Sequence, residues 1–242
     1  MRLLFLLFTL LLSAALSAQP TIVAIPSADG ITISADAYLL PDEKPHPTIL
    51  LCHQAGYSRG EYREIAPKLN ALGYNCIAID QRSGKTCNGI DNQTAAQAHT
   101  KKIGTEYIDA IPDIISAATY LHDKYQQKII LWGSSYSAGL ALWYAGQRPA
   151  IVQAVIAFSP GEHYGEKMVL KDAIQSLSVP AFVTSARSEA PELTTLIAGV
   201  KSIQQYIPKG EGKHGSSALY DKQKDHEEYW TALETFLKLN SK

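Results

Sequence analysis

The sequence predicts an α/β fold, in which a mainly parallel sheet of eight strands carries helices on both faces. Three observations predict this fold class. Apolar, β-branched runs alternate with helix-like segments from residue 48 onward, an Asp-Gly hairpin signal lies near the start, and no internal repeat breaks the pattern. Because strand–helix–strand units connect as right-handed crossovers, the alternation favours parallel strands preceded by one antiparallel pair.

Each predicted strand is a short run of apolar and β-branched residues. In chain order the strands are Thr21–Ile25, Ile31–Leu40, Thr48–His53, Asn75–Asp80, Lys128–Trp132, Val152–Phe158, Ala181–Thr184 and Lys201–Tyr206. The predicted helices are Glu61–Leu72, Glu106–Lys124, Ser135–Gln147, Pro191–Val200 and Tyr220–Leu239. Reactive side chains are expected in the loops at the carboxyl ends of the parallel strands.

The connection between Phe158 and Ala181 is short. It holds only about 20 residues, which leaves room for one short helix and for no large lid. We therefore expect an open site.

The N-terminal segment has the pattern of a secretory signal peptide. One positive charge at Arg2 precedes an apolar stretch, Leu3–Leu12, and small residues follow up to Ala18. A membrane anchor is the alternative, but the apolar stretch is shorter than the roughly 20 residues that a span needs. We expect residues 1–18 to be removed, leaving one domain, residues 19–242, that is secreted or periplasmic and not held in a membrane.

Composition narrows the range of partners and the redox chemistry. A net charge of −1 argues against a nucleic-acid or anionic-lipid surface, both of which need a basic excess. Three cysteines are too few for a disulfide framework. Cys52 and Cys76 lie in strand-like runs and are expected in the core, whereas Cys87 lies in a polar loop, either free or paired with Cys52. The oligomeric state is left open.

The most informative motif is GSSYS at residues 133–137, between an apolar run and a helix-like segment. A serine on a sharp strand-to-helix turn is exposed above the sheet, and the helix N-terminus beside it offers free N–H groups. Ser135 is the preferred nucleophile because Gly133 precedes it by two residues, directly after the strand. Ser137 is the alternative nucleophile, and a plain serine N-cap is the structural alternative.

A serine nucleophile needs a base, and the base needs an orienting acid. His214 is the preferred base because the loop EGKHG at residues 211–215 follows the last strand and flanks the histidine with glycines. Two acids follow neighbouring strand ends. Glu189 is preferred because its position gives the order serine, acid, histidine, and Glu162 is the alternative.

Stabilisation of an oxyanion requires two N–H groups aimed at one point. The backbone amide of Tyr136, immediately after the nucleophile, is expected to supply one. The second is expected from the loop after Thr48–His53, with Ala55 as the preferred backbone donor and Gln54 as a backbone or side-chain alternative.

Together these residues resemble the α/β-hydrolase superfamily over nearly the whole mature chain. HQAG at residues 53–56 resembles the family's His-Gly oxyanion loop, and DQRSG at residues 80–84 is similar to its Asp-x-Arg-Gly turn. The short insertion after Phe158 looks like the compact dienelactone-hydrolase-like and serine-aminopeptidase-like branches. Three positions depart from the family pattern: Gln54 and Ser137 replace glycines, and Glu189 replaces the commoner aspartate.

The resemblance implies a serine hydrolase with a Ser135–His214–Glu189 triad that cleaves an ester-type acyl bond of a small molecule. No cofactor is expected, and no spacing of metal ligands is present in the sequence. Two alternatives stay open: an amide- or peptide-bond hydrolase, and a non-catalytic binding protein that retains the fold. An aromatic rim for a bound group is a further possibility, formed by Tyr57, Tyr62, Tyr136 and Tyr164.

Overall fold

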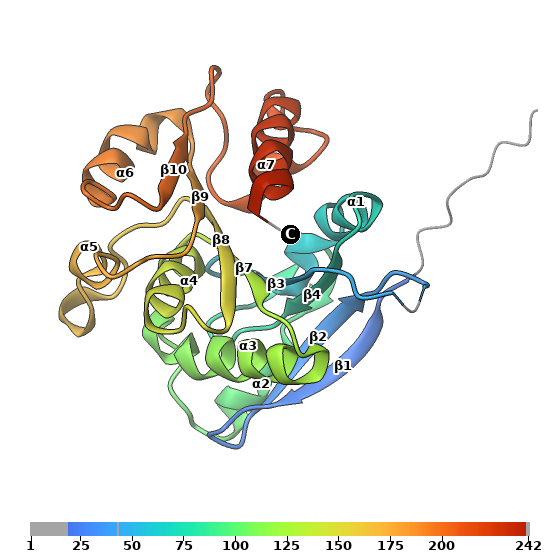
Figure 1. Cartoon of the computed structure of the whole chain (residues 1–242). Helices are drawn as coiled ribbons and strands as arrows, with labels where there is room; N and C mark the ends of the chain where they lie inside the picture. Colours follow the sequence, from blue (N-terminus) through green and yellow to red (C-terminus); the bar gives the residue numbers. More distant parts are fainter. Residues whose placement is uncertain (1–18, 43, 241–242) are drawn as a thin grey trace, which may run out of the picture.

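The computed structural model describes residues 19–42 and 44–240, which form one central sheet covered by helices on both faces (Figure 1). The predicted signal peptide, residues 1–18, lies outside the described residues.

The sheet has eight strands in the order β1-β2-β4-β3-β7-β8-β9-β10. Their bounds are β1 Thr21–Pro26, β2 Thr32–Tyr38, β3 Thr48–Cys52, β4 Asn75–Ile79, β7 Ile129–Ser134, β8 Val152–Phe158, β9 Ala181–Thr184 and β10 Ile203–Tyr206. β1 pairs with β2, and β2 with β4, in antiparallel register, whereas the other five pairings are parallel. The predicted fold class is therefore confirmed, including the leading antiparallel hairpin.

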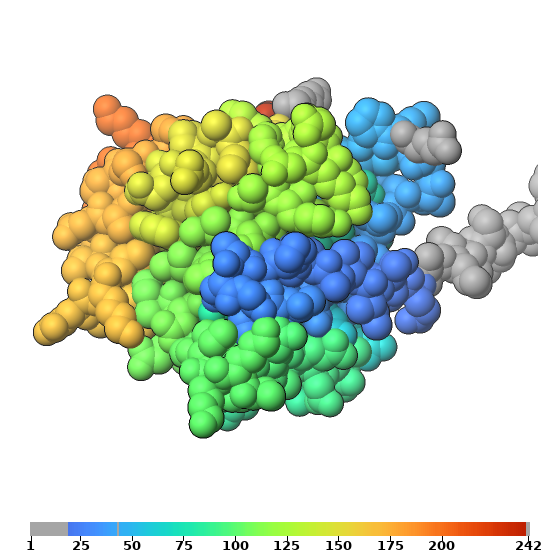
Figure 2. Space-filling model, turned by 90° about the horizontal axis from the view of Figure 1, so that it is seen from below, coloured from blue at the N-terminus to red at the C-terminus, as the bar shows by residue number. Residues whose placement is uncertain are grey.

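The helices complete two layers around the sheet. They are α1 Ile65–Ala71, α2 Gln93–Thr100, α3 Ile111–Tyr125, α4 Tyr136–Gln147, α5 Leu170–Ala173, α6 Ala190–Leu196 and α7 His226–Asn240. One apolar cluster joins α3, α4 and α6 to a face of the sheet, and a second joins α1 and α7 to the opposite face. Figure 2 shows the β1–β2 hairpin, in blue, exposed across the middle of the face that is seen, between yellow-green segments above and green segments below.

Several predicted helices begin later than their sequence pattern suggests. Short 3-10 turns, Arg59–Tyr62 and Tyr107–Ala110, precede α1 and α3. A further 3-10 turn, Ser216–Leu219, lies within the chain that leads to α7. Between β8 and β9 the described chain contains only one 3-10 turn, Gly165–Lys167, and the one-turn helix α5, so the predicted absence of a large lid is confirmed.

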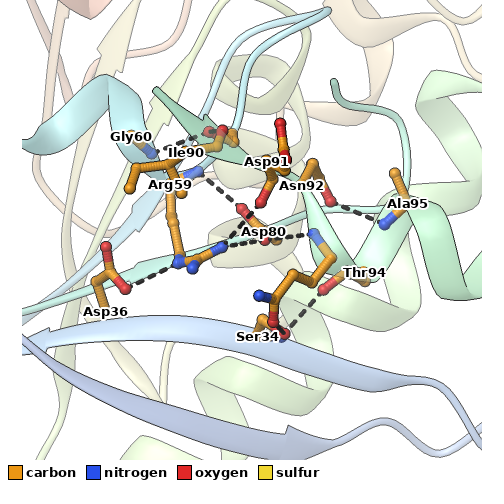
Figure 3. A network of polar contacts seen from close by, with 12 residues as sticks. Ser34, Asp36, Arg59, Gly60, Asp80, Ile90, Asp91, Asn92, Thr94 and Ala95 are labelled. Atoms are coloured by element: carbon orange, nitrogen blue, oxygen red, sulfur yellow. Dashed lines mark hydrogen bonds and ion pairs between the residues drawn. The ribbon is translucent and has the colours of Figure 1, made fainter. Parts of the chain in front are cut away.

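An excursion after β4 was not predicted. It consists of the small hairpin β5 (Thr86–Cys87) and β6 (Ile90–Asp91) followed by α2. A buried ion network anchors it to the sheet: the Arg59 guanidinium donates to Asp36 at 2.8 Å and to Asp80 at 2.6 Å (Figure 3). The same guanidinium donates to the Asp91 carbonyl, and the Asp80 carboxylate accepts the Gln93 amide at the start of α2.

All three cysteines are unpaired and buried. Cys52 and Cys76 lie in the core as predicted, at 0% exposure. Cys87 belongs to β5 and is also buried, so the structure selects the free state of this thiol over a bond to Cys52. Among the described residues no helix has the length and hydropathy needed to cross a bilayer.

Candidate active site

The turn that carries Ser135 joins β7 to α4 and is held in an unusual backbone conformation. Ser135 has φ 58° and ψ −123°, a combination that non-glycine residues rarely adopt and that persists where surrounding contacts enforce it. The Ser135 amide donates to the Phe158 carbonyl at 2.7 Å, and the Ser135 carbonyl accepts from the Ala138 amide. A Cβ atom on Gly133 would lie 2.4 Å from the Ala138 backbone, so glycine is required there.

Ser137, the alternative nucleophile, has a different environment. It is fully buried, and its hydroxyl accepts the Ser134 amide and donates to the Cys52 carbonyl, both at 2.8 Å. Ser137 stands where the G-x-S-x-G motif of the family has its second glycine. Its hydroxyl therefore links the turn to β3 below the site.

Ser135 and His214 are in direct contact. The Ser135 Oγ atom lies 2.9 Å from His214 Nε2, and His214 Nδ1 lies 2.6 Å from Glu189 Oε1. Ser135 follows β7, Glu189 ends the 3-10 turn Arg187–Glu189 after β9, and His214 lies in the loop after β10. Parallel strands bring these three loops to one edge of the sheet, and the geometry matches a serine–histidine–acid triad.

The Glu189 carboxylate is held at both oxygens. One oxygen contacts His214, and the other accepts the Ser159 hydroxyl at 2.8 Å and the Ala186 amide at 3.2 Å. Partial burial raises the pKa of Glu189, but the hydrogen bonds from His214 and Ser159 outweigh it and lower the pKa below its usual value. The carboxylate therefore stays charged beside the imidazole.

Glu162, the alternative acid, lies elsewhere in the site. Its two carboxylate oxygens accept the backbone amides of Leu170 and Lys171, at 2.7 and 2.8 Å, at the start of α5. No contact between Glu162 and His214 is present. The structure therefore places Glu189, and not Glu162, beside the histidine.

Two backbone amides of the predicted oxyanion site, those of Tyr136 and Ala55, have no hydrogen-bond acceptor among the described residues. The Tyr136 amide is the first of α4, where no carbonyl one turn earlier in the same helix can accept it. In the loop after β3, the Gln54 amide donates to Glu61 Oε2 at 2.8 Å. Ala55, which follows, donates to no other described residue. The geometry thus favours Ala55 over the Gln54 amide as the partner of Tyr136.

Two residues that the sequence did not single out connect the segments of the site. Glu61 is fully buried: its Oε2 accepts the Gln54 amide, and its Oε1 accepts the Ser134 hydroxyl at 2.8 Å. The same hydroxyl accepts the Ser216 amide at 2.8 Å, so one carboxyl links the oxyanion loop, the nucleophile turn and the histidine loop. Burial raises the pKa of Glu61 to about 7, despite these hydrogen bonds.

Ser159 is the second such residue. It has φ 53° and follows β8 directly. Its hydroxyl donates to Glu189 and accepts the Gly215 amide at 3.1 Å, which ties the acid to the histidine loop. The Ser-Pro-Gly sequence at a strand end was the available signal for a special conformation here. Nothing local in the sequence marks Glu61, because its carboxylate joins the loop of Gln54 to Ser134, which is 73 positions away.

His53, the first residue of the HQAG segment, contacts neither Ser135 nor His214. The fully buried ring donates from Nδ1 to the Gln54 carbonyl, and Nε2 accepts the Gln81 amide at 2.9 Å. Burial lowers the pKa of His53 to about 4, so the ring is neutral at pH 7. Over residues 19–42 and 44–240, no cluster of three or more His, Cys, Asp or Glu side chains is arranged to hold a metal ion.

Of the four tyrosines expected to form an aromatic rim, Tyr57 is partly exposed and the other three are buried. Tyr62 and Tyr136 are fully buried, and Tyr164 is 5% exposed. Tyr62 donates to the Cys52 carbonyl, and Tyr164 donates to the Tyr136 carbonyl. These rings therefore pack below the surface, and the exposed aromatic ring in this region is Tyr107, which stacks on Tyr136 with a centroid distance of 4.7 Å.

Several solved structures share this fold. A dienelactone hydrolase from Anabaena variabilis is 16% identical, covers 93% of this chain and 100% of its own, and has a TM-score of 0.70. The Pyrococcus furiosus esterase Pf2001 is 18% identical, covers 93% of each chain, and also has a TM-score of 0.70. Est1E from Butyrivibrio proteoclasticus is 15% identical over 90% of this chain and 97% of its own, with a TM-score of 0.66.

Comparison of the sequence with curated proteins gives no significant match. A family model described as the alpha/beta hydrolase fold matches residues 47–198, which is more than half of the chain and runs from β3 through α6. The matched region contains the Ser135 turn, the loop after β3 and Glu189, and it ends before His214. The chain therefore belongs to the alpha/beta hydrolase family.

Proposed function

We propose that this protein is a serine hydrolase that cleaves an ester-type acyl bond of a small molecule. The observation that carries the proposal is the continuous chain of contacts from Ser135 Oγ through the His214 ring to Glu189, at 2.9 and 2.6 Å. The fold shared with esterases and a dienelactone hydrolase supports it as analogy.

The chemistry follows from the geometry. Ser135 Oγ attacks the acyl carbon while its proton passes to His214 Nε2, and Glu189 orients the imidazole and stabilises its charged form. The negative charge on the carbonyl oxygen is received by the amides of Tyr136 and Ala55. Collapse of the tetrahedral intermediate breaks the bond to the alcohol, which takes the proton from His214. Water, activated by the same histidine, then hydrolyses the acyl-enzyme.

The test uses the purified mature chain with short-chain esters and a fluorophosphonate probe. Wild type should hydrolyse the esters and be labelled at Ser135, whereas Ser135→Ala should lose about 10⁴-fold or more in kcat and should not be labelled. Equal rates for the two proteins would overturn the nucleophile assignment. A chain that neither reacts nor is labelled would instead be a binding protein with this fold, and parallel amide substrates decide the bond type.

We also propose that residues 1–18 direct export and are removed after Ala18. The supporting observation is the pattern of one cation, a short apolar stretch and small residues. N-terminal sequencing of the exported protein should begin at Gln19. An intact N-terminus on a membrane-bound product would contradict cleavage and favour the anchor.

A further inference from the structure

A cavity of about 360 Å³ lies between the 3-10 turn that precedes α3 and the insertion after β8. Two of its lining residues, Tyr107 and Tyr164, contact Tyr136, the residue after Ser135. Its lining is Glu106, Tyr107, Ile108, His163, Tyr164, Gly165 and Lys167. This volume falls within the range of small-molecule sites, and a cavity of about 150 Å³ already accommodates a benzene ring. The mechanism described above uses none of these side chains.

The walls of this cavity are aromatic and fixed in place. Tyr107 stacks on Tyr136 with an interplanar angle of 17°, and Tyr136 is held by a hydrogen bond from Ser83 to its hydroxyl. The His163 ring stands nearly perpendicular to Tyr107 and to Tyr164, with centroids 6.4 and 6.3 Å away. Three rings with set orientations therefore line part of a space that suits another flat ring, because aromatic pairs prefer stacked and edge-to-face contacts.

The cavity lining carries no net charge near neutral pH. The Glu106 and Lys167 side chains form an exposed ion pair of 2.7 Å that balances their charges. Desolvation of the His163 ring, together with the charge of nearby His214, lowers the pKa of His163, so this ring is neutral. A neutral group is therefore favoured over a carboxylate or an ammonium group.

A second cavity, of about 350 Å³, lies on the histidine side of the site and shares His163 with the first. His214 and Glu189 line it, together with Glu162 and Glu192. Because His214 returns its proton to the leaving alcohol, the alcohol must lie beside His214 and hence toward this second cavity. His214 does not line the cavity over Tyr107, so that cavity is left for the acyl group.

We propose that the cavity lined by Tyr107, His163 and Tyr164 is an acyl subsite for a neutral aromatic ring, so that the substrates are esters of aryl-substituted carboxylic acids. This inference rests on the proposed function. Tyr107 is its main determinant, because this ring is 38% exposed and lies on the buried Tyr136 as a platform.

The test compares methyl phenylacetate with methyl cyclohexylacetate, which differ in a flat or a puckered ring one carbon away from the carbonyl. The ratio of the two kcat/KM values is divided by the ratio of the hydroxide-catalysed rates of the same esters, because the phenyl group also makes the ester intrinsically more reactive. Wild type should favour the phenyl ester in this corrected ratio by about three- to tenfold, as expected for an aromatic pair. Tyr107→Ala should bring the corrected ratio near one, and Tyr107→Phe should retain it. Ile22→Ala is the matched control, because Ile22 is 67% exposed on β1 and lines neither cavity.

A second substrate pair tests whether the ring binds on the acyl side or on the alcohol side of the ester. Benzyl acetate and cyclohexylmethyl acetate move the same rings to the alcohol, and here no preference is expected. Three outcomes would overturn the inference: a ring preference seen only with the acetate pair, a wild-type acyl ratio near one, or an acyl ratio that Tyr107→Ala leaves unchanged. In each case the hydrolysis of the esters would still support the proposed function. Absence of both hydrolysis and Ser135 labelling would overturn the two together.

Discussion

At the residue scale, Glu189 and Glu162 both follow strand ends but differ in what their carboxylates contact. Glu189 accepts from His214, whereas Glu162 accepts two amides of α5. In the sequence, the order serine, acid, histidine favoured Glu189. In the structure, the distance to His214 distinguishes Glu189 from Glu162. Ser159 and Glu61 escaped prediction because a hydrogen bond between segments that are distant in sequence leaves no local pattern.

Replacement of the acid tests this difference. Glu189→Gln should lower kcat by about 10³–10⁴-fold, because the amide no longer stabilises the imidazolium and favours the wrong tautomer. Glu162→Gln removes the same charge from the same region and should cost less than about tenfold. Steady-state kinetics on one ester, with folding checked by circular dichroism, decides between them. A larger loss in Glu162→Gln would move the acid role to Glu162.

Glu61 and His53 should give the stability of the protein opposite dependences on pH. The pKa of Glu61 rises from 4.5 in the unfolded chain to about 7 in the fold, so its contribution is present below pH 4.5 and lost as the pH rises through 7. The pKa of His53 falls from 6.5 to about 4, so its contribution is present above pH 6.5 and lost as the pH falls through 4.

Urea unfolding of Glu61→Gln at several pH values tests the predicted contribution of Glu61 to the pH dependence of stability. Relative to wild type, the variant should gain about 3 kcal/mol of unfolding free energy between pH 4.5 and pH 8, because it cannot ionise. His53→Gln should show the opposite trend, gaining relative to wild type as the pH falls from 6.5 to 4. A constant difference between Glu61→Gln and wild type at every pH would contradict the Glu61 shift.

At the scale of elements, the eight strands of the main sheet were predicted well, because most are short apolar or alternating runs bounded by turns or helices. The excursion between β4 and α3 was not. The segment QTAAQAHT of α2 is polar and has no strong apolar periodicity. Its position is instead set by the Asn92 side chain, which accepts the Ala95 amide, and by the buried Asp80 carboxylate. Such tertiary contacts override weak local propensity.

The ion network of Figure 3 should therefore control the stability of this excursion. Asp80→Asn leaves the Arg59 guanidinium, 4% exposed, short of one countercharge and should cost about 3–5 kcal/mol in unfolding free energy. Lys238→Met breaks the exposed pair with Glu234 and should cost less than about 1 kcal/mol. Chemical denaturation measures both, and equal small losses would show that the buried pair contributes little.

At the scale of the whole molecule, parallel strands deliver the nucleophile, acid and histidine loops to one edge, which the order of the motifs in the sequence already indicated. Neither cavity could be foreseen, because each is bounded by side chains from separate loops. Tyr107 illustrates the difficulty: its role follows from stacking on Tyr136, 29 positions away in sequence.

The short insertion between β8 and β9 predicts how the rate depends on substrate concentration. With only α5 and one 3-10 turn in that connection, residues 159–180 include no long segment that could cover the site and be displaced at a lipid surface. Hydrolysis of tributyrin should therefore rise hyperbolically with concentration and show no jump at the solubility limit. An abrupt increase above that limit would show that another part of the chain covers the site.

The three unpaired thiols have a consequence for producing the protein. Burial raises the pKa of Cys87 to about 11, and raises those of Cys52 and Cys76 further, so little thiolate exists at neutral pH. Since the three cysteines form no disulfide bond, folding requires neither an oxidant nor a disulfide isomerase. The polypeptide should reach its native state equally well in a reducing cytosol and in an oxidising compartment, and dithiothreitol should leave its melting temperature unaltered.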